Sequence, residues 1–172
     1  MQLAPSQVQR FFSIWKPLLL YVNERQGLVP RMDFDDPRRI PDIHKLRQAV
    51  WKDDAVLDIF ALENPAKLSK EDLALLKSWR HRVAGKFFIF RQLKKHAIFM
   101  TSSRVYAVLS LQSFFEELVP QIPCYVEAVL LPFEEQIIYD GLLAPYPVVF
   151  GRGIQASMNE EYMAAKKRAK NN

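Results

Sequence analysis

The chain of 172 residues has little of several features that would assign a protein to a class at once. It contains one cysteine, Cys124, so no intramolecular disulfide can form, and a lone thiol fits a reducing compartment. The first residues do not follow a signal-peptide pattern, because Arg10, Lys16 and Pro17 interrupt the apolar positions. No apolar run approaches the ~18 residues that cross a bilayer. The sequence therefore predicts a cytoplasmic protein with no membrane partner.

Motifs that name a reaction are also missing. The sequence has no P-loop, dinucleotide fingerprint or nucleophile elbow. His44, His81 and His96 lie far apart, and none has a partner at the short spacing typical of zinc ligands. The acidic loop at 31–41 lacks the glycine and the distal glutamate of a calcium loop, and its own arginines can neutralise it. We therefore expect a salt-bridged loop, no metal and no cofactor.

The first half of the chain has the periodicity of helices. Apolar residues recur at steps of three and four in an amphipathic stripe made of Val8, Phe11, Phe12, Trp15, Leu18, Leu19 and Val22. Ser6 is a suitable N-cap for this helix, and Pro17 within it predicts a kink or two short helices. Asp42, Asp53 and Ser69 are suitable starts for three further helices.

From residue 84 the pattern changes to that of strands. Aromatic and β-branched residues predict an antiparallel meander over 87–93, 97–101 and 105–111. A short helical crossover at 113–119 precedes a predicted second hairpin. That hairpin and a possible edge strand cover 124–131, 136–143 and 147–150.

The expected fold class is α+β: a helical N-terminal half packed on a five- or six-stranded, mainly antiparallel sheet, with a C-terminal helix. We expect a single domain over 1–172, made of a helical half (1–83), a sheet (84–151), and a C-terminal helix with a basic tail (152–172). A capping box at 157–160 begins that last helix. Before it, backbone N–H groups and a guanidinium could bind an anion at Gly151, Arg152 and Gly153.

Residues 73–115 contain no Asp or Glu. The cations there that are candidate ligands for phosphate groups are Arg80, Arg82, Lys86, Arg91, Lys94, Lys95 and Arg104. Aromatic rings lie between them, at Phe87, Phe88, Phe90, His96 and Tyr106. Binding of single-stranded nucleic acid requires such cations beside accessible aromatic faces. The alternative is that the rings fill a core while Lys94 and Lys95 solvate a turn, and periodicity does not separate the two.

Residues 105–151 have the opposite charge to the preceding stretch, with six acidic residues and no Lys or Arg. If 132–135 forms a four-residue loop, Glu127 lies directly opposite Asp140, with Cβ atoms about 4.5–5.5 Å apart. Such a pair on an apolar face is unfavourable unless it is solvated, bound to a cation, shares a proton or takes part in catalysis. A salt bridge to Arg91 or Arg104, or a different strand register, is the alternative.

Three classes of function follow from these patterns. The favoured one is a binding module that holds RNA or single-stranded nucleic acid on the basic, aromatic-rich meander. The second is a small hydrolase-like enzyme with Glu127 and Asp140 as its catalytic pair. The third is an interaction module whose basic and acidic faces pair with another protein or with a second copy. Whether the protein is an enzyme is left open by the sequence.

Overall fold

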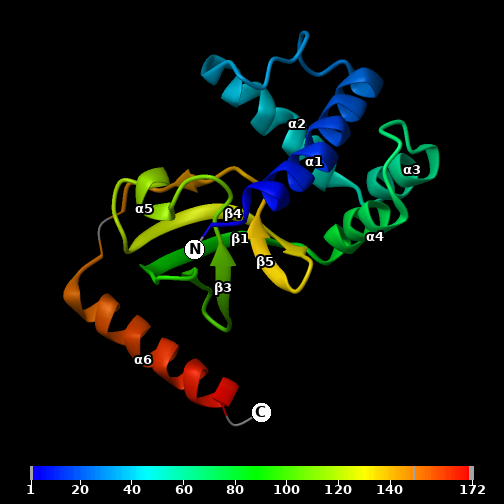
Figure 1. The fold of residues 1–172 in the computed structure, drawn as a ribbon. Coiled ribbons are helices and arrows are strands. Elements are labelled where there is room, and N and C mark those ends of the chain that lie inside the picture. The colour runs from blue at the N-terminus through cyan, green and yellow to red at the C-terminus, as the bar shows by residue number, and fades with distance from the viewer. Residues whose placement is uncertain (1, 149, 171–172) are drawn as a thin grey trace. The chain divides into compact units, whose positions relative to one another are not determined.

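The computed structural model describes residues 2–148 and 150–170, and these form an α+β fold as the sequence predicts (Figure 1). The chain divides into two compact units. The helical unit is Ala4–His81, and the sheet unit combines the residues before Ala4 with the chain from Arg82 onward. The boundary between the two units lies between His81 and Arg82.

The helical unit has the elements α1 (Pro5–Gln26), η1 (Pro37–Arg39), α2 (Ile40–Lys52), α3 (Ala55–Glu63), α4 (Lys70–Ser78) and η2 (Trp79–His81). The predicted stripe of α1 is buried at Phe11, Trp15, Leu18 and Leu19, whereas Phe12 is half-buried. Aromatic rings meet in this core: the centroid of Trp79 lies 5.7 Å from that of Phe11 and 6.0 Å from that of Trp15.

The predicted start of α1 and the predicted alternative of two short helices are both wrong. The helix begins at Pro5 after the N-cap Ala4, not after Ser6, because Pro5 lacks the N–H that the first helical position leaves unbonded. Residues on both sides of Pro17 remain in one helix of 22 residues. Burial of the apolar stripe before and after Pro17 outweighs the backbone hydrogen bond that proline removes.

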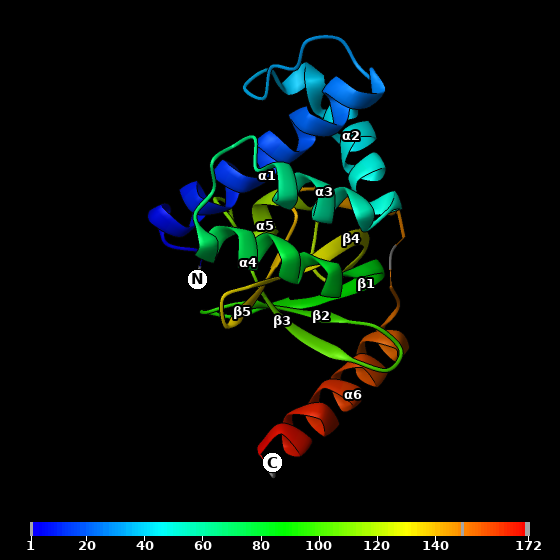
Figure 2. The ribbon, with the colours of Figure 1, turned by 90° about the vertical axis from the view of Figure 1, so that its right-hand side faces the viewer.

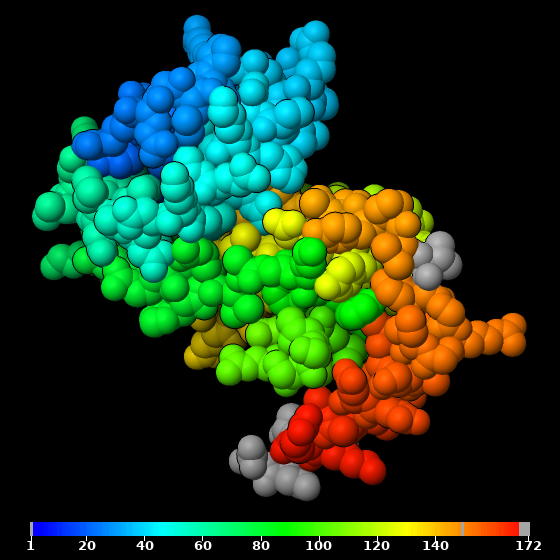
Figure 3. Space-filling model, turned by 180° about the vertical axis from the view of Figure 1, so that it is seen from behind, coloured from blue at the N-terminus to red at the C-terminus, as the bar shows by residue number. Residues whose placement is uncertain are grey.

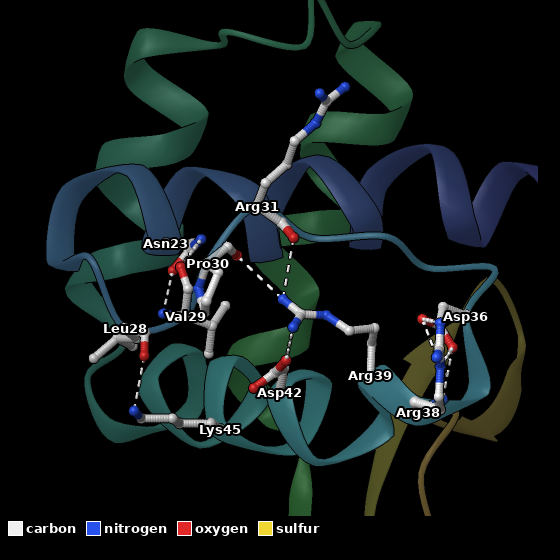
Figure 4. Close-up of polar contacts among 10 residues, drawn as sticks. All are labelled: Asn23, Leu28, Val29, Pro30, Arg31, Asp36, Arg38, Arg39, Asp42 and Lys45. Carbon is white, nitrogen blue, oxygen red and sulfur yellow. Dashed lines mark hydrogen bonds and ion pairs between the residues drawn. The ribbon is translucent and has the colours of Figure 1, made fainter.

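The loop between α1 and α2 is held by local polar contacts, as predicted (Figure 4). Arg38 forms an ion pair with Asp36 at 2.9 Å. Arg39 donates to the carbonyl oxygen of Arg31 at 3.1 Å and forms an ion pair with Asp42 at 2.9 Å. Across residues 2–148 and 150–170, no three His, Cys, Asp or Glu side chains come together as a set able to hold a metal ion.

The start of α4 provides a test of local helix stability. The hydroxyl of Ser69 accepts a hydrogen bond from the backbone N–H of Asp72 at 3.1 Å, as an N-cap does. Ser69→Ala should lower the free energy of unfolding by about 1 kcal/mol, because it leaves that N–H without its acceptor. Thermal unfolding followed by circular dichroism measures the change. Ser69→Asp, which keeps an acceptor, should restore stability, and an equal loss in both variants would contradict the capping role.

The sheet unit contains β1 (Val83–Gln92), β2 (Ala97–Met100), β3 (Val105–Leu109), α5 (Phe115–Leu118), β4 (Cys124–Phe133), β5 (Gln136–Tyr139), β6 (Ala144–Pro145) and α6 (Arg152–Lys170). The strands form one sheet in the order β1-β2-β3-β5-β4-β6, and β1 also pairs with β4. The first five strands therefore close into a barrel. Between the named strands the pairings are antiparallel except that of β3 with β5, which is parallel.

The interior of the barrel is apolar. Alternate residues of β1, β2 and β4 are fully buried there, including Phe87, Phe99 and Val126. The short helix α5, which connects β3 to β4, contributes Phe115. Its ring centroid lies 5.0 Å from that of Phe99 and 5.2 Å from that of Tyr139. The buried core explains why only some of the aromatic residues in the meander remain accessible.

The predicted register of the second hairpin is wrong. Pro132 and Phe133 pair with β5, so the connection is the two-residue turn Glu134–Glu135 rather than a loop of four. Extension of β4 buries Phe133 completely, and Glu134 adopts a left-handed backbone conformation (φ 56°) that permits the tight turn. Every pairing in the hairpin is therefore displaced by two residues from the predicted one.

The C-terminal region also differs from the prediction. Helix α6 begins at Arg152, before the predicted capping box, and includes two residues of the Gly151–Gly153 turn. The edge strand is β6, at Ala144–Pro145. Of the strand predicted at 147–150, residue 149 lies outside the described residues and the other three are not in a strand. Among the helices described here, none is both long and apolar enough to cross a bilayer.

Candidate nucleic-acid interface

One outer face of the barrel carries both cations and aromatic rings. Lys86 and Phe88 are two residues apart on β1, so their side chains lie on the same face. The cross-strand partners of Phe88 are Met100 on β2 and Tyr125 on β4. A bulge between Ile89 and Arg91 adds one residue to β1. It places Arg91 opposite Ile98, on the same face as Met100, where strict alternation would direct it into the barrel. We call this surface the outer face.

Four aromatic residues on or beside the outer face form an aromatic cluster: Phe88, Tyr125, Tyr146 and Phe150. The ring centroid of Phe88 lies 4.7 Å from that of Tyr125 and 4.8 Å from that of Phe150. The rings of Tyr125 and Tyr146 are 5.4 Å apart. All four residues are half-buried, unlike Phe87 in the barrel interior. Part of the surface of each residue is therefore accessible to solvent.

Charged groups border the aromatic cluster. The ammonium group of Lys86 lies 5.2 Å from the ring centroid of Tyr146, a cation–π distance. The hydroxyl of Tyr146 donates to the carboxylate of Glu127 at 3.1 Å, and Glu127 is the cross-strand partner of Lys86. Cation and carboxylate thus share one face here. The charges that are segregated along the chain are therefore interleaved at this point of the sheet.

The first part of helix α6 packs on the outer face, against β1 and β2, and the helix then runs away from the strands (Figures 2 and 3). Met158 is buried in an apolar cluster with Phe90, Ile98 and Met100, and Tyr162 packs against it. The Arg91 guanidinium lies 4.6 Å from the ring centroid of Phe90 and 5.6 Å from that of Tyr162. Arg91 also donates to the side-chain oxygen of Asn159 at 3.3 Å. Arg91 therefore contacts α6 from β1, and the Arg91 side chain remains exposed.

A cavity of about 420 Å³, the α6 pocket, lies where the first half of α6 meets the strands. Its apolar lining comprises Phe88, Met100, Tyr125, Ile154 and Met158. Its polar lining comprises Lys86, Thr101, Ser102, Ser157 and Glu161. A volume in this range, with apolar walls and a few polar groups, is typical of ligand sites.

A second cavity of about 490 Å³, the turn pocket, lies near the β1–β2 and β4–β5 turns. Lys95, His96 and Glu135 line it together with Ala107, Leu109, Gln136 and Ile137. Partial burial, and to a lesser extent the neighbouring charge of Lys95, lower the pKa of His96. The lowered pKa favours the neutral imidazole, and Lys95 contributes a positive charge to the pocket.

The structure brings most of the predicted phosphate ligands into the sheet unit, but not all of them. Arg80 belongs to the helical unit, where it forms an ion pair with Asp58. Arg82 directly precedes β1. The others follow the strands of the outer face and the turns that join them: Lys86 and Arg91 on β1, Lys94 and Lys95 in the β1–β2 turn, and Arg104 in the β2–β3 turn. These five side chains are exposed.

Glu127 and Asp140 do not lie opposite each other in the sheet, so the predicted carboxylate pair does not form. Glu127 is exposed and pairs with Lys86 and Ala144, whereas Asp140 is fully buried and its N–H donates to the carbonyl oxygen of Val129 at 3.0 Å. The two-residue turn is the cause, because it moves the partner of Glu127 away from Asp140. The carboxylate of Asp140 accepts from the N–H of Leu142 at 3.3 Å and so stabilises the end of β5.

The proposed anion site at Gly151, Arg152 and Gly153 forms the N-terminus of α6. All three residues are exposed, and Arg152 and Gly153 belong to the first turn of the helix. Sequence reasoning missed Tyr125, Tyr146 and Glu161 as parts of a site. The alternation of apolar and polar residues in β4 could have indicated that Tyr125 faces outward. The packing of α6 against the strands is not encoded in any local sequence pattern.

No protein-family model matches this chain, and no curated protein or solved structure does either.

Proposed function

We propose that the sheet unit binds single-stranded nucleic acid, RNA or DNA, along the outer face of the barrel. The observation that carries the proposal is the aromatic cluster, in which half-buried rings lie beside the exposed ammonium group of Lys86. Bases of any sequence stack on such rings, while cations beside them neutralise the phosphates. Arg91, Lys94, Lys95 and Arg104 continue the line of cations along the same strands and turns.

The connectivity of the barrel supports the same function. A five-stranded barrel closed in the order β1-β2-β3-β5-β4, with a helix between β3 and β4, has the connectivity of the OB-fold. Proteins with that fold bind oligonucleotides or oligosaccharides on strands β2 and β3 and at the β1–β2 and β4–β5 loops. The turn pocket lies near the same two turns and contains Lys95 and His96. This support is an analogy of fold, and the site residues carry the proposal.

Salt dependence tests the proposal. The native protein should bind a labelled RNA of about ten nucleotides at low salt. Each phosphate contact should contribute about 0.7 to the slope of log affinity against log salt for a single strand. The triple variant Lys94→Glu, Lys95→Glu, Arg104→Glu should bind more weakly, and the slope should fall by about 2. Fluorescence anisotropy at several salt concentrations measures both quantities.

A second triple variant separates a defined interface from general charge attraction. Lys52→Glu, Lys70→Glu and Lys77→Glu make the same change in net charge at exposed lysines of the helical unit. This control should retain the affinity and the slope of the native protein. Equal weakening in the two triple variants, or no binding of RNA and single-stranded DNA by the native protein, would refute the proposed function.

A further inference from the structure

The α6 pocket joins an aromatic floor to a polar rim. Met100 and Met158 are buried and Phe88 and Tyr125 are half-buried, so these four side chains lie deepest, whereas the apolar Ile154 is exposed at the rim. Lys86, Ser102, Ser157 and Glu161 are exposed and therefore lie where the pocket opens to solvent. A ligand that suits this arrangement has a flat apolar face and a polar edge. Nucleobases combine these two properties.

The charges at the rim narrow the choice of base. Glu161 is a carboxylate, which accepts hydrogen bonds and donates none when ionised. Cytosine, adenine and guanine carry an exocyclic amino group that donates to such an acceptor. Uracil and thymine present a carbonyl oxygen where cytosine has its amine. Their N3–H can donate to a carboxylate, but it lies between two carbonyl oxygens that the carboxylate repels, so these bases bind less well. Lys86, at the same rim, is suited to a phosphate of the backbone.

Other occupants fit the lining less well. An acyl chain would use the apolar floor but would leave Lys86 and Glu161 without a role in binding. Free phosphate would be attracted by Lys86 and repelled by Glu161, and it would gain nothing from the rings. The rings of Phe88 and Tyr125, 4.7 Å apart at an angle of 41°, both line the pocket and give a flat ligand aromatic surface to contact.

We infer that the α6 pocket is a base-reading site that accepts an amino-bearing nucleobase and disfavours uracil and thymine, with Glu161 as the hydrogen-bond acceptor. The inference rests on the proposed function and adds a specificity to it. Helix α6 is then part of the binding site and not only a cover of the outer face, since Ile154, Ser157, Met158 and Glu161 all come from it.

Two pyrimidine homopolymers of about ten nucleotides, oligocytidylate and oligouridylate, test the inference near neutral pH. The native protein should bind oligocytidylate about tenfold more tightly, the effect of one hydrogen bond to a charged acceptor. Glu161→Gln should bring the two affinities within about twofold, because an amide both donates and accepts. The control Glu160→Gln removes the same charge from the adjacent exposed residue, which does not line the pocket, and should keep the native ratio.

The possible outcomes are distinct. Equal affinity of the native protein for the two oligomers, with binding still present, would overturn the base-reading site and leave the proposed function intact. An equal change of the ratio in Glu160→Gln and Glu161→Gln would also overturn it, because the effect would then come from net charge. Absence of binding to either oligomer at low salt would refute the proposed function, and the inference with it.

Discussion

Phe11→Ala should lower the free energy of unfolding of the helical unit by about 3–5 kcal/mol. Phe11 is fully buried, and its ring centroid lies 5.7 Å from that of Trp79 and 6.2 Å from that of Trp15. Truncation to alanine removes the burial of the ring and leaves a cavity beside the indole rings of Trp15 and Trp79. Both terms destabilise the native state.

Tryptophan fluorescence during urea unfolding measures this loss, because Trp15, Trp51 and Trp79 all belong to the helical unit. Phe12→Ala is the matched control, since Phe12 is the adjacent phenylalanine on the same helix but only half-buried. Its truncation should cost about 1–1.5 kcal/mol, roughly half of the full burial term. Equal losses in the two variants would show that the direction of the α1 stripe has been misassigned.

The thiol of Cys124 should react with a disulfide reagent on the order of 100-fold more slowly in the folded protein than in the denatured chain. Burial raises the pKa of Cys124 to about 11, against about 8.5 for an ordinary cysteine thiol. The thiolate is the reacting species, so its population near pH 8 falls by about that factor. Rapid labelling of the native protein would contradict the placement of Cys124 in the barrel wall.

The same pKa shift makes stability depend on alkaline pH. Below about pH 8.5 the thiol is protonated in both the folded and the unfolded state, so it adds no pH dependence. Between about 8.5 and the folded value of about 11, only the unfolded chain releases the proton, and stability falls as pH rises. The loss amounts to about 3 kcal/mol. Cys124→Ala should abolish the part of this decline that lies below pH 10.

Ionisation of Tyr139 also lowers the stability of the fold as pH rises, but at higher pH than Cys124. The pKa of Tyr139 is raised by burial and, secondarily, by the charge of Asp140. Above about pH 10 the unfolded chain therefore loses a proton that the folded state retains, which lowers stability further. The decline that remains in Cys124→Ala should begin only there. Urea unfolding at stepped pH values separates the two contributions.

Local patterns predicted most of the helices and strands but not the closure of the strands into a barrel. The apolar stripe of α1 and the alternation in the meander are properties of neighbouring residues, and both are confirmed. The pairing of β1 with β4, and the parallel pairing of β3 with β5, join segments far apart in the chain. No local periodicity encodes which distant strand a given edge will meet.

The aromatic residues of β1 show that local patterns were also insufficient to predict which side chains reach the outer face. Alternation separates Phe87 from Phe88, but only the closed barrel determines that Phe87 faces the core. The bulge then breaks the alternation and directs Arg91 to the outer face. In the second hairpin, Pro132 occupies a strand position, whereas the sequence pattern predicts it in the loop because proline is common in loops. That misplacement produced the incorrect pairing of Glu127 with Asp140.

Residues 2–3 and the residues from Arg82 onward belong to the same unit, which constrains the order of folding during synthesis. The N–H of Leu3 bonds to the carbonyl oxygen of Ser110, so residues 2–3 belong with the sheet, and the whole helical unit is inserted between them and β1. Domains fold as they emerge from the ribosome, at about 5–20 residues per second. The helical unit is complete at His81, whereas the barrel cannot close before β5 ends at Tyr139, roughly sixty residues later. For some 3–12 s, the nascent chain would therefore carry a folded helical unit beside unpaired, aromatic-rich strands, the period in which it depends most on chaperones.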